Sequence, residues 1–161
     1  MPFSIYIKVS STEWKPGSRM LKGTEYEDLL GEFAKYIAEE YVKQLIDGIN
    51  NQRYKGSWEP LTPAYLDYKR KNNMSENIWE ATGFLKDSIG VWKYKNYYVV
   101  GVKRNIVYPG SKVPVYKVVR WIEFGTSKMP ARPLFLPIKR SISGNIRNYW
   151  NKFLLEREDD I

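Results

Sequence analysis

The feature that most constrains the fold is a series of apolar residues that recur every three or four positions within residues 25–50. This spacing places them on one face of an α-helix and predicts a single long amphipathic helix over residues 25–50. Thr24 and Glu27 form the S/T-x-x-E pattern of a capping box, which marks the helix start. The apolar stripe consists of Tyr26, Leu29, Leu30, Phe33, Ile37, Tyr41, Leu45 and Ile49. Other parts of the chain must cover a stripe this wide.

Two β-forming segments are expected to supply that cover as a sheet. Residues 3–9 alternate apolar and polar side chains, which is the period-two pattern of a half-buried strand. Residues 88–102 are rich in Val, Ile, Trp and Tyr, and Lys95-Asn96 can turn the chain between two strands, so a hairpin is predicted. We therefore expect a single α+β domain over residues 1–161, in which an antiparallel sheet with at least one further strand packs against the long helix.

The segment between the long helix and the hairpin is polar and irregular. We expect residues 51–83 to form a long excursion that contains one short helix. Thr62 is suited to the N-cap position and Pro63 to the first helical position, so this helix should begin there and continue to about Arg70.

The C-terminal third combines an ambiguous segment with two clearer ones. Residues 116–123 fit a helix by their apolar spacing and a strand by their β-branching, and both alternatives stay open. The prolines of residues 129–137 predict an extended segment at a sheet edge or in a loop. Residues 138–156 have helical spacing and predict a C-terminal helix, and residues 156–161 form an acidic tail.

Composition excludes most catalytic chemistry. The chain has no His and no Cys, so zinc sites, iron–sulfur clusters, thiol nucleophiles and Ser-His-Asp triads are all excluded. Its glycines form neither G-x-G-x-x-G nor a Walker loop. The acidic residues of the basic half are expected to be solvated partners of Lys and Arg. We therefore expect that the protein is not an enzyme and that it has no cofactor and no metal site. Since the longest apolar run has only the length of a strand, we also expect no membrane span.

Positive charge is concentrated in one part of the chain. The net charge is +8, but residues 58–155 carry seventeen basic and six acidic side chains, a net of +11. A protein this basic can associate with polyanions, so a non-specific nucleic-acid-binding protein is the alternative function. Aromatic and basic residues are interleaved in residues 92–98, which fits a stacking platform for bases, although an exposed hairpin face is the favoured interpretation.

One acidic residue stands apart from the others. Glu123 lies between Ile122 and Phe124, and a half-buried carboxylate needs a partner, for which Arg120 and Arg132 are the candidates. Gly125, two residues later, is expected to adopt a positive φ as a cap or turn residue.

Three stretches carry a resemblance to a known family. They are W-E-P-L-T-P-A-Y-L at residues 58–66, T-G-F-L-K-D-S-I at residues 82–89, and I-E-F-G-T at residues 122–126 running into M-P-A-R-P-L-F at residues 129–135. In this order they resemble the tail-completion, or virion-morphogenesis, proteins of tailed bacteriophages, a family of head–tail connector and neck components. The resemblance covers about residues 58–140, and this sequence departs from the pattern by placing Leu134 before Phe135.

The resemblance implies a structural protein of the virion, located at the neck or the head-proximal tail end and assembled in the host cytoplasm. Its partners would be further copies of itself in a ring, hexameric or, if head-proximal, twelve-fold, together with neighbouring neck, tail-tube or connector proteins. DNA passing through the lumen would make at most weak, non-specific contacts. The residues that carry the motif are Trp58, Pro60, Leu61, Thr82, Gly83, Leu85, Glu123, Phe124, Gly125, Thr126, Pro130, Arg132 and Pro133.

Overall fold

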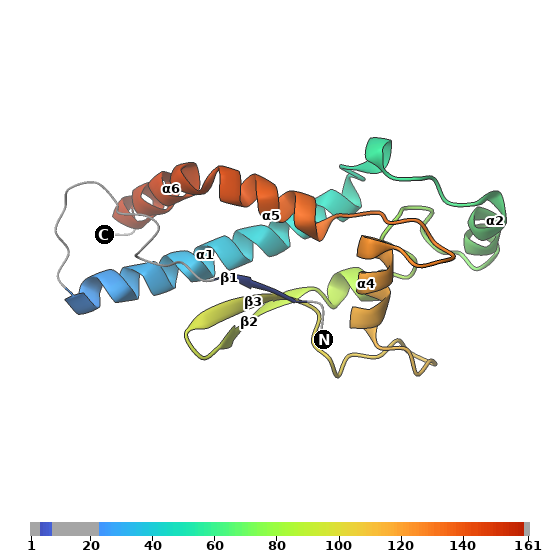
Figure 1. The fold of residues 1–161 in the computed structure, drawn as a ribbon, viewed down its shortest axis with the longest axis horizontal. Coiled ribbons are helices and arrows are strands. Elements are labelled where there is room, and N and C mark those ends of the chain that lie inside the picture. The colour runs from blue at the N-terminus through green and yellow to red at the C-terminus, as the bar shows by residue number, and fades with distance from the viewer. Residues whose placement is uncertain (1–3, 8–22, 160–161) are drawn as a thin grey trace.

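A long helix, a small sheet and two C-terminal helices make up most of the fold (Figure 1). The structure is a computed structural model and describes residues 4–7 and 23–159. The elements are, in order, β1 (Ser4–Ile7), α1 (Gly23–Asn50), the 3-10 helix η1 (Lys55–Ser57), α2 (Pro63–Lys71), α3 (Phe84–Asp87), β2 (Gly90–Tyr94), β3 (Tyr97–Gly101), α4 (Val115–Phe124), α5 (Phe135–Gly144) and α6 (Ile146–Asp159).

Helix α1 is the central element, and the predicted α+β fold with a sheet packed on this helix is confirmed. In Figure 1, α1 runs between the sheet and the pair α5 and α6, and it contacts all three. From Leu29 onward the predicted stripe belongs to the core, where Phe33, Ile37, Tyr41, Leu45 and Ile49 are each 0 to 3% exposed, while the side chain of Tyr26 lies outside the described part of the chain. Burying each of these side chains contributes about 1.5–3 kcal/mol, which explains why one helix organises the domain.

The sheet has three strands in the order β1-β3-β2, with both pairings antiparallel. The predicted hairpin is confirmed, and Lys95 at its turn has a φ of 54°, as a tight two-residue turn requires. The first predicted strand is present over Ser4–Ile7, and the rest of residues 3–9 lies outside the described residues. The expected further strand is wrong within the described ranges, where the other β-pairings are two isolated bridges.

The ambiguous segment of the C-terminal third is a helix, α4. Val115, Val119 and Glu123 recur at four-residue spacing and are 0 to 2% exposed, while much of the opposite face is open to solvent. In a strand the exposed Lys117 and Trp121 would share a face with Val115 and Val119, so only a helix separates the buried side chains from the exposed ones. This burial outweighs the β-preference of the branched residues.

The extended segment is shorter than predicted. It ends at Leu134, because α5 begins at Phe135 and includes Pro137. A proline is tolerated there since the first turn of a helix has no partner for its N–H groups. The predicted helix over residues 138–156 is present as α5 and α6, which meet at Asn145 directly after Gly144, a residue that weakens helix interiors. Along the described residues, no helix combines the length and apolarity needed to cross a membrane.

Candidate functional site

Helix α4 ends in a tight turn that only glycine fits. Gly125 has a φ of 74°, so the predicted positive φ is confirmed. A Cβ atom at this position would lie 2.8 Å from the Ala131 nitrogen and 2.9 Å from the Met129 oxygen. The turn is closed by Thr126, whose backbone N–H donates to the Met129 carbonyl at 2.8 Å. The E-F-G-T motif therefore reverses the chain and lays residues 130–134 back across α4.

The Glu123 carboxylate of α4 caps the next helix in the chain, α5. It accepts hydrogen bonds from the three consecutive backbone N–H groups of residues 134–136, at 2.8 to 3.0 Å. Helix α5 needs this cap, because its own N-cap residue, Leu134, has no side chain that can accept. The predicted pairing of Glu123 with Arg120 or Arg132 is wrong, since backbone donors satisfy both of its oxygens.

The surroundings of Glu123 also affect its protonation. Its side chain is almost fully buried at 2% exposure. Burial raises the pKa of the Glu123 carboxyl above its usual value, against the opposing effect of the three backbone donors.

Arg132 connects two of the three motif stretches. Its guanidinium is buried and donates from Nε to the Glu59 carbonyl at 2.6 Å and from Nη2 to the Pro60 carbonyl at 3.0 Å. Its backbone N–H donates to the Ile122 carbonyl at 2.7 Å. The side chain thus fixes residues 58–66 against residues 129–135 through neutral acceptors, not through a carboxylate.

Two tryptophans also hold residues 130–134. The Trp58 indole N–H donates to the Pro133 carbonyl at 2.8 Å, and the Trp79 indole N–H donates to the Arg132 carbonyl at 2.9 Å. Both side chains are buried, at 4% and 3% exposure. Trp79 was not among the residues that the sequence predicted for this site. The available signal was a large aromatic residue beside Ile78 within an otherwise polar stretch, which indicates a local anchor in the core.

The second stretch forms the start of α3. Gly83 has a φ of 89° at the N-cap, and the Thr82 hydroxyl accepts a long hydrogen bond from the Phe84 N–H at 3.5 Å. Leu85 is buried in the core. All three stretches also meet around one cavity of about 210 Å³, whose lining includes Leu61, Thr82, Leu85, Ile122 and Arg132.

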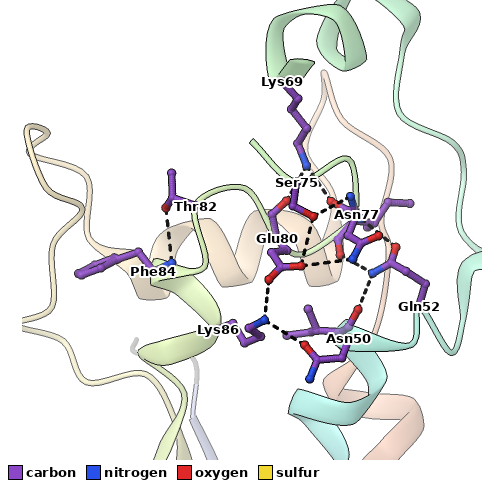
Figure 2. A network of polar contacts seen from close by, with 11 residues as sticks. Asn50, Gln52, Lys69, Ser75, Asn77, Glu80, Thr82, Phe84 and Lys86 are labelled. Atoms are coloured by element: carbon purple, nitrogen blue, oxygen red, sulfur yellow. Dashed lines mark hydrogen bonds and ion pairs between the residues drawn. The ribbon is translucent and has the colours of Figure 1, made fainter. Parts of the chain in front are cut away.

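A polar network fixes the excursion before α3 (Figure 2). The Glu80 carboxylate is at its centre and pairs with Lys86 at 2.5 Å, and Lys86 also donates to the Asn50 side chain at 2.9 Å. Ser75 and Asn77 donate to the other Glu80 oxygen, at 3.2 Å each. Lys86 and the other donors hold the pKa of Glu80 below its usual value. Glu80 is therefore an ion-pair partner as predicted, but the prediction that it is solvated is wrong, since its side chain is only 15% exposed.

Two further side chains of the network bind backbone. Gln52 both donates to and accepts from the backbone of Ile78 at 2.9 Å. Lys69, which is buried, donates from Nζ to the Asn77 and Glu80 carbonyls at 2.7 and 2.6 Å, and its pKa is lowered by burial. Together these contacts give a defined shape to residues 72–83.

The remaining motif residues are exposed or half-buried. Phe124 is 54% exposed, Pro60 and Thr126 are also exposed, and Pro130 and Pro133 are half-buried. In the part of the chain that the structure describes, no three acidic side chains gather in a group that could hold a metal ion.

Comparison of this chain with protein-family models, curated proteins and solved structures gave no match.

Proposed function

We propose that this protein is a structural component of a tailed-phage virion, in which copies form a ring at the head–tail junction or tail terminus during tail completion and head–tail joining. One observation carries the proposal. The three stretches that resemble tail-completion proteins contain residues up to 75 positions apart in sequence, and these residues line one cavity and hold one segment, residues 130–134.

This convergence supports treating the three stretches as one signature. Chance matches at separate places in a sequence have no reason to contact one another. Here Arg132 of the third stretch binds the backbone of the first, and Leu85 of the second lines the same cavity. The buried motif residues thus maintain a fold, and the subunit's outer surface is left to make contacts with other proteins.

Two measurements test the proposal. The purified protein should form a closed ring, hexameric or twelve-fold, in native mass spectrometry and negative-stain electron microscopy. Antibodies against it should label the neck or the head-proximal tail end of purified virions. Absence of the protein from virions that are otherwise complete contradicts the proposal.

A titration with duplex DNA separates the proposal from a nucleic-acid-binding function. If DNA only passes through the ring, the isolated protein should bind it no better than about micromolar at 150 mM salt, where the Debye length is about 8 Å. The affinity should show no sequence preference and fall steeply as salt rises. Nanomolar, sequence-selective binding by a monomer would overturn the neck proposal.

A further inference from the structure

The cavity around which the three motif stretches meet has the size and lining of a small ligand site. It measures about 210 Å³, and most of its lining is apolar or aromatic. An apolar cavity of about 150 Å³ already binds benzene. Tyr65 and Trp121 belong to the lining and are each 43% exposed, so the cavity is open to solvent. A molecule with one aromatic ring can therefore enter and fit.

Two buried cations line this cavity, and neutral groups hold both of them. Lys69 is 2% exposed and Arg132 is 5% exposed, and the hydrogen bonds of their side chains go to backbone carbonyls. Glu80 also lines the cavity, but both of its carboxylate oxygens already accept hydrogen bonds from other side chains. Because buried charges are favourable only when they are paired, this lining favours an anion.

Three donor groups of the lining are still available to such an anion. Arg132 donates from Nε and Nη2, and its Nη1 forms no hydrogen bond within the described residues. The hydroxyls of Tyr65 and Tyr108 form none there either, and both residues line the cavity. Among the described residues that are not exposed, no fully buried side-chain nitrogen or oxygen lacks a partner, so Nη1 and the Tyr108 hydroxyl must contact open space. Tyr65 is itself partly exposed.

The same three groups influence one another electrostatically. Burial raises the pKa of the Tyr65 hydroxyl, and the charge of Arg132 acts in the opposite direction. Burial raises the pKa of Tyr108 to about 12, and Tyr65 adds to this increase. Effects of this kind act between neighbouring groups, so the three donors surround one part of the cavity. Both hydroxyls keep their protons at neutral pH and can donate.

We propose that this cavity binds a small aromatic carboxylate, whose carboxylate accepts hydrogen bonds from Arg132, Tyr65 and Tyr108. Hydrogen bonds to a charged acceptor are stronger than those between neutral groups, and Lys69 adds a second positive charge nearby. The rings of Trp79 and Trp121 also belong to the lining and can pack against the ring of the ligand. The inference goes beyond the proposed virion ring and does not depend on it.

Isothermal titration calorimetry with phenylacetate tests the inference, because this probe joins one aromatic ring to one carboxylate. The full chain should bind it saturably at neutral pH, with a dissociation constant of about 1 mM or tighter. Phenylacetamide has nearly the same shape without the charge and should bind about tenfold more weakly. Absence of saturation by phenylacetate up to about 10 mM, or equal affinity for the two probes, overturns the inference.

Removal of single hydroxyls tests the position of the carboxylate. Tyr65→Phe and Tyr108→Phe keep the aromatic ring, and each should weaken phenylacetate binding about fivefold by removing one donor. Tyr68→Phe makes the same change on α2 and is the matched control, because Tyr68 stacks on Tyr65 but is not part of the cavity lining. An equal loss in the control, or no loss in either cavity variant, contradicts the proposed site.

Filling the cavity tests where the aromatic ring lies. Ala81 is a half-buried lining residue, so Ala81→Leu should abolish binding of both probes while circular dichroism stays unchanged. Undiminished binding by this variant places the probe elsewhere and overturns the inference.

A second copy of the chain is the alternative occupant of the cavity. Titrations at low and high protein concentration, with the mass in solution measured by ultracentrifugation, distinguish it from a small ligand. The same affinity at both concentrations supports the inference. Binding by the monomer that disappears as copies associate would show that a neighbouring chain fills the cavity, and overturns it.

Discussion

Two glutamates in this protein form several hydrogen bonds each, but in contrasting surroundings. Glu123 is 2% exposed and receives only neutral backbone donors from the start of α5. Glu80 has a side chain that is 15% exposed and belongs to a network with Lys86. The first positions a helix within the core, and the second positions an excursion at the surface.

Burial, more than the number of hydrogen bonds, decides how much such a glutamate contributes to the stability of the fold. Water can replace the partners of Glu80 if one is removed, so its loss is partly compensated. Water cannot reach the donors of Glu123 without opening the core, so its loss leaves polar groups unpaired.

Glu123→Ala should lower the free energy of unfolding by about 3–5 kcal/mol, because it removes the acceptor of two buried and one partly buried N–H group and leaves a cavity. Denaturant titration with tryptophan fluorescence measures the change. Glu123→Gln retains one acceptor oxygen at nearly the same size and should lose less. An Ala variant as stable as the wild type contradicts the capping role.

Gly125→Val should cost about 2 kcal/mol, since its Cβ would contact backbone atoms at a φ that other residues avoid. The thermal midpoint gives the readout. Gly144→Ala is the matched control, because its Cβ has open space at the end of α5 and should cause no loss. Equal midpoints for both variants would show that the turn can rearrange.

Glu80→Gln should cost about 1 kcal/mol at neutral pH, the ordinary contribution of a partly exposed polar contact. Denaturant titration against the wild type at pH 7 measures it. Asp87→Asn changes an exposed carboxyl in the same region and should cost less. If Glu80→Gln matched Glu123→Ala in its effect, burial would not be the deciding factor.

The two carboxyls should also have opposite pH signatures. The pKa of Glu80 is lowered by folding, so its contribution is present above the unfolded pKa of about 4.5 and lost as pH falls through the lower folded value. The pKa of Glu123 is raised, so the stability linked to its proton is present below the unfolded pKa and lost as pH rises through the folded value. Unfolding titrations of both Gln variants from pH 3 to 7 should show differences from wild type that change in opposite directions. Parallel profiles contradict this assignment.

Arg70→Ala should have the smallest effect. Its ion pairs with Glu76 and Asp67 lie on an exposed face of α2, where solvent and salt screen them. No measurable shift of the thermal midpoint is expected at 150 mM salt. A clear shift would mean that this surface pair also positions the excursion.

Local patterns were enough to predict the elements that depend on local chemistry. The period of the apolar residues identified α1, the clustering of β-formers identified the hairpin, and Thr62-Pro63 identified α2, where the Thr62 hydroxyl accepts from the Tyr65 N–H. In the candidate site, the positive φ of Gly125 was also predictable, because a glycine that ends a periodic segment is a common helix stop.

The tertiary structure decided the conformation of the ambiguous segment and the contacts of the candidate site. Whether residues 116–123 form a helix depended on which side chains the core would bury, and the partner of Glu123 depended on where the chain returned after Gly125. A sequence pattern suggests an arginine for a buried carboxylate, but three backbone N–H groups at a helix start satisfy it equally well, and only the folded chain brings them there. Sequence by itself determined the elements whose hydrogen bonds are local, while contacts between residues far apart in the chain determined the site, since their free energy exists only once the fold has formed.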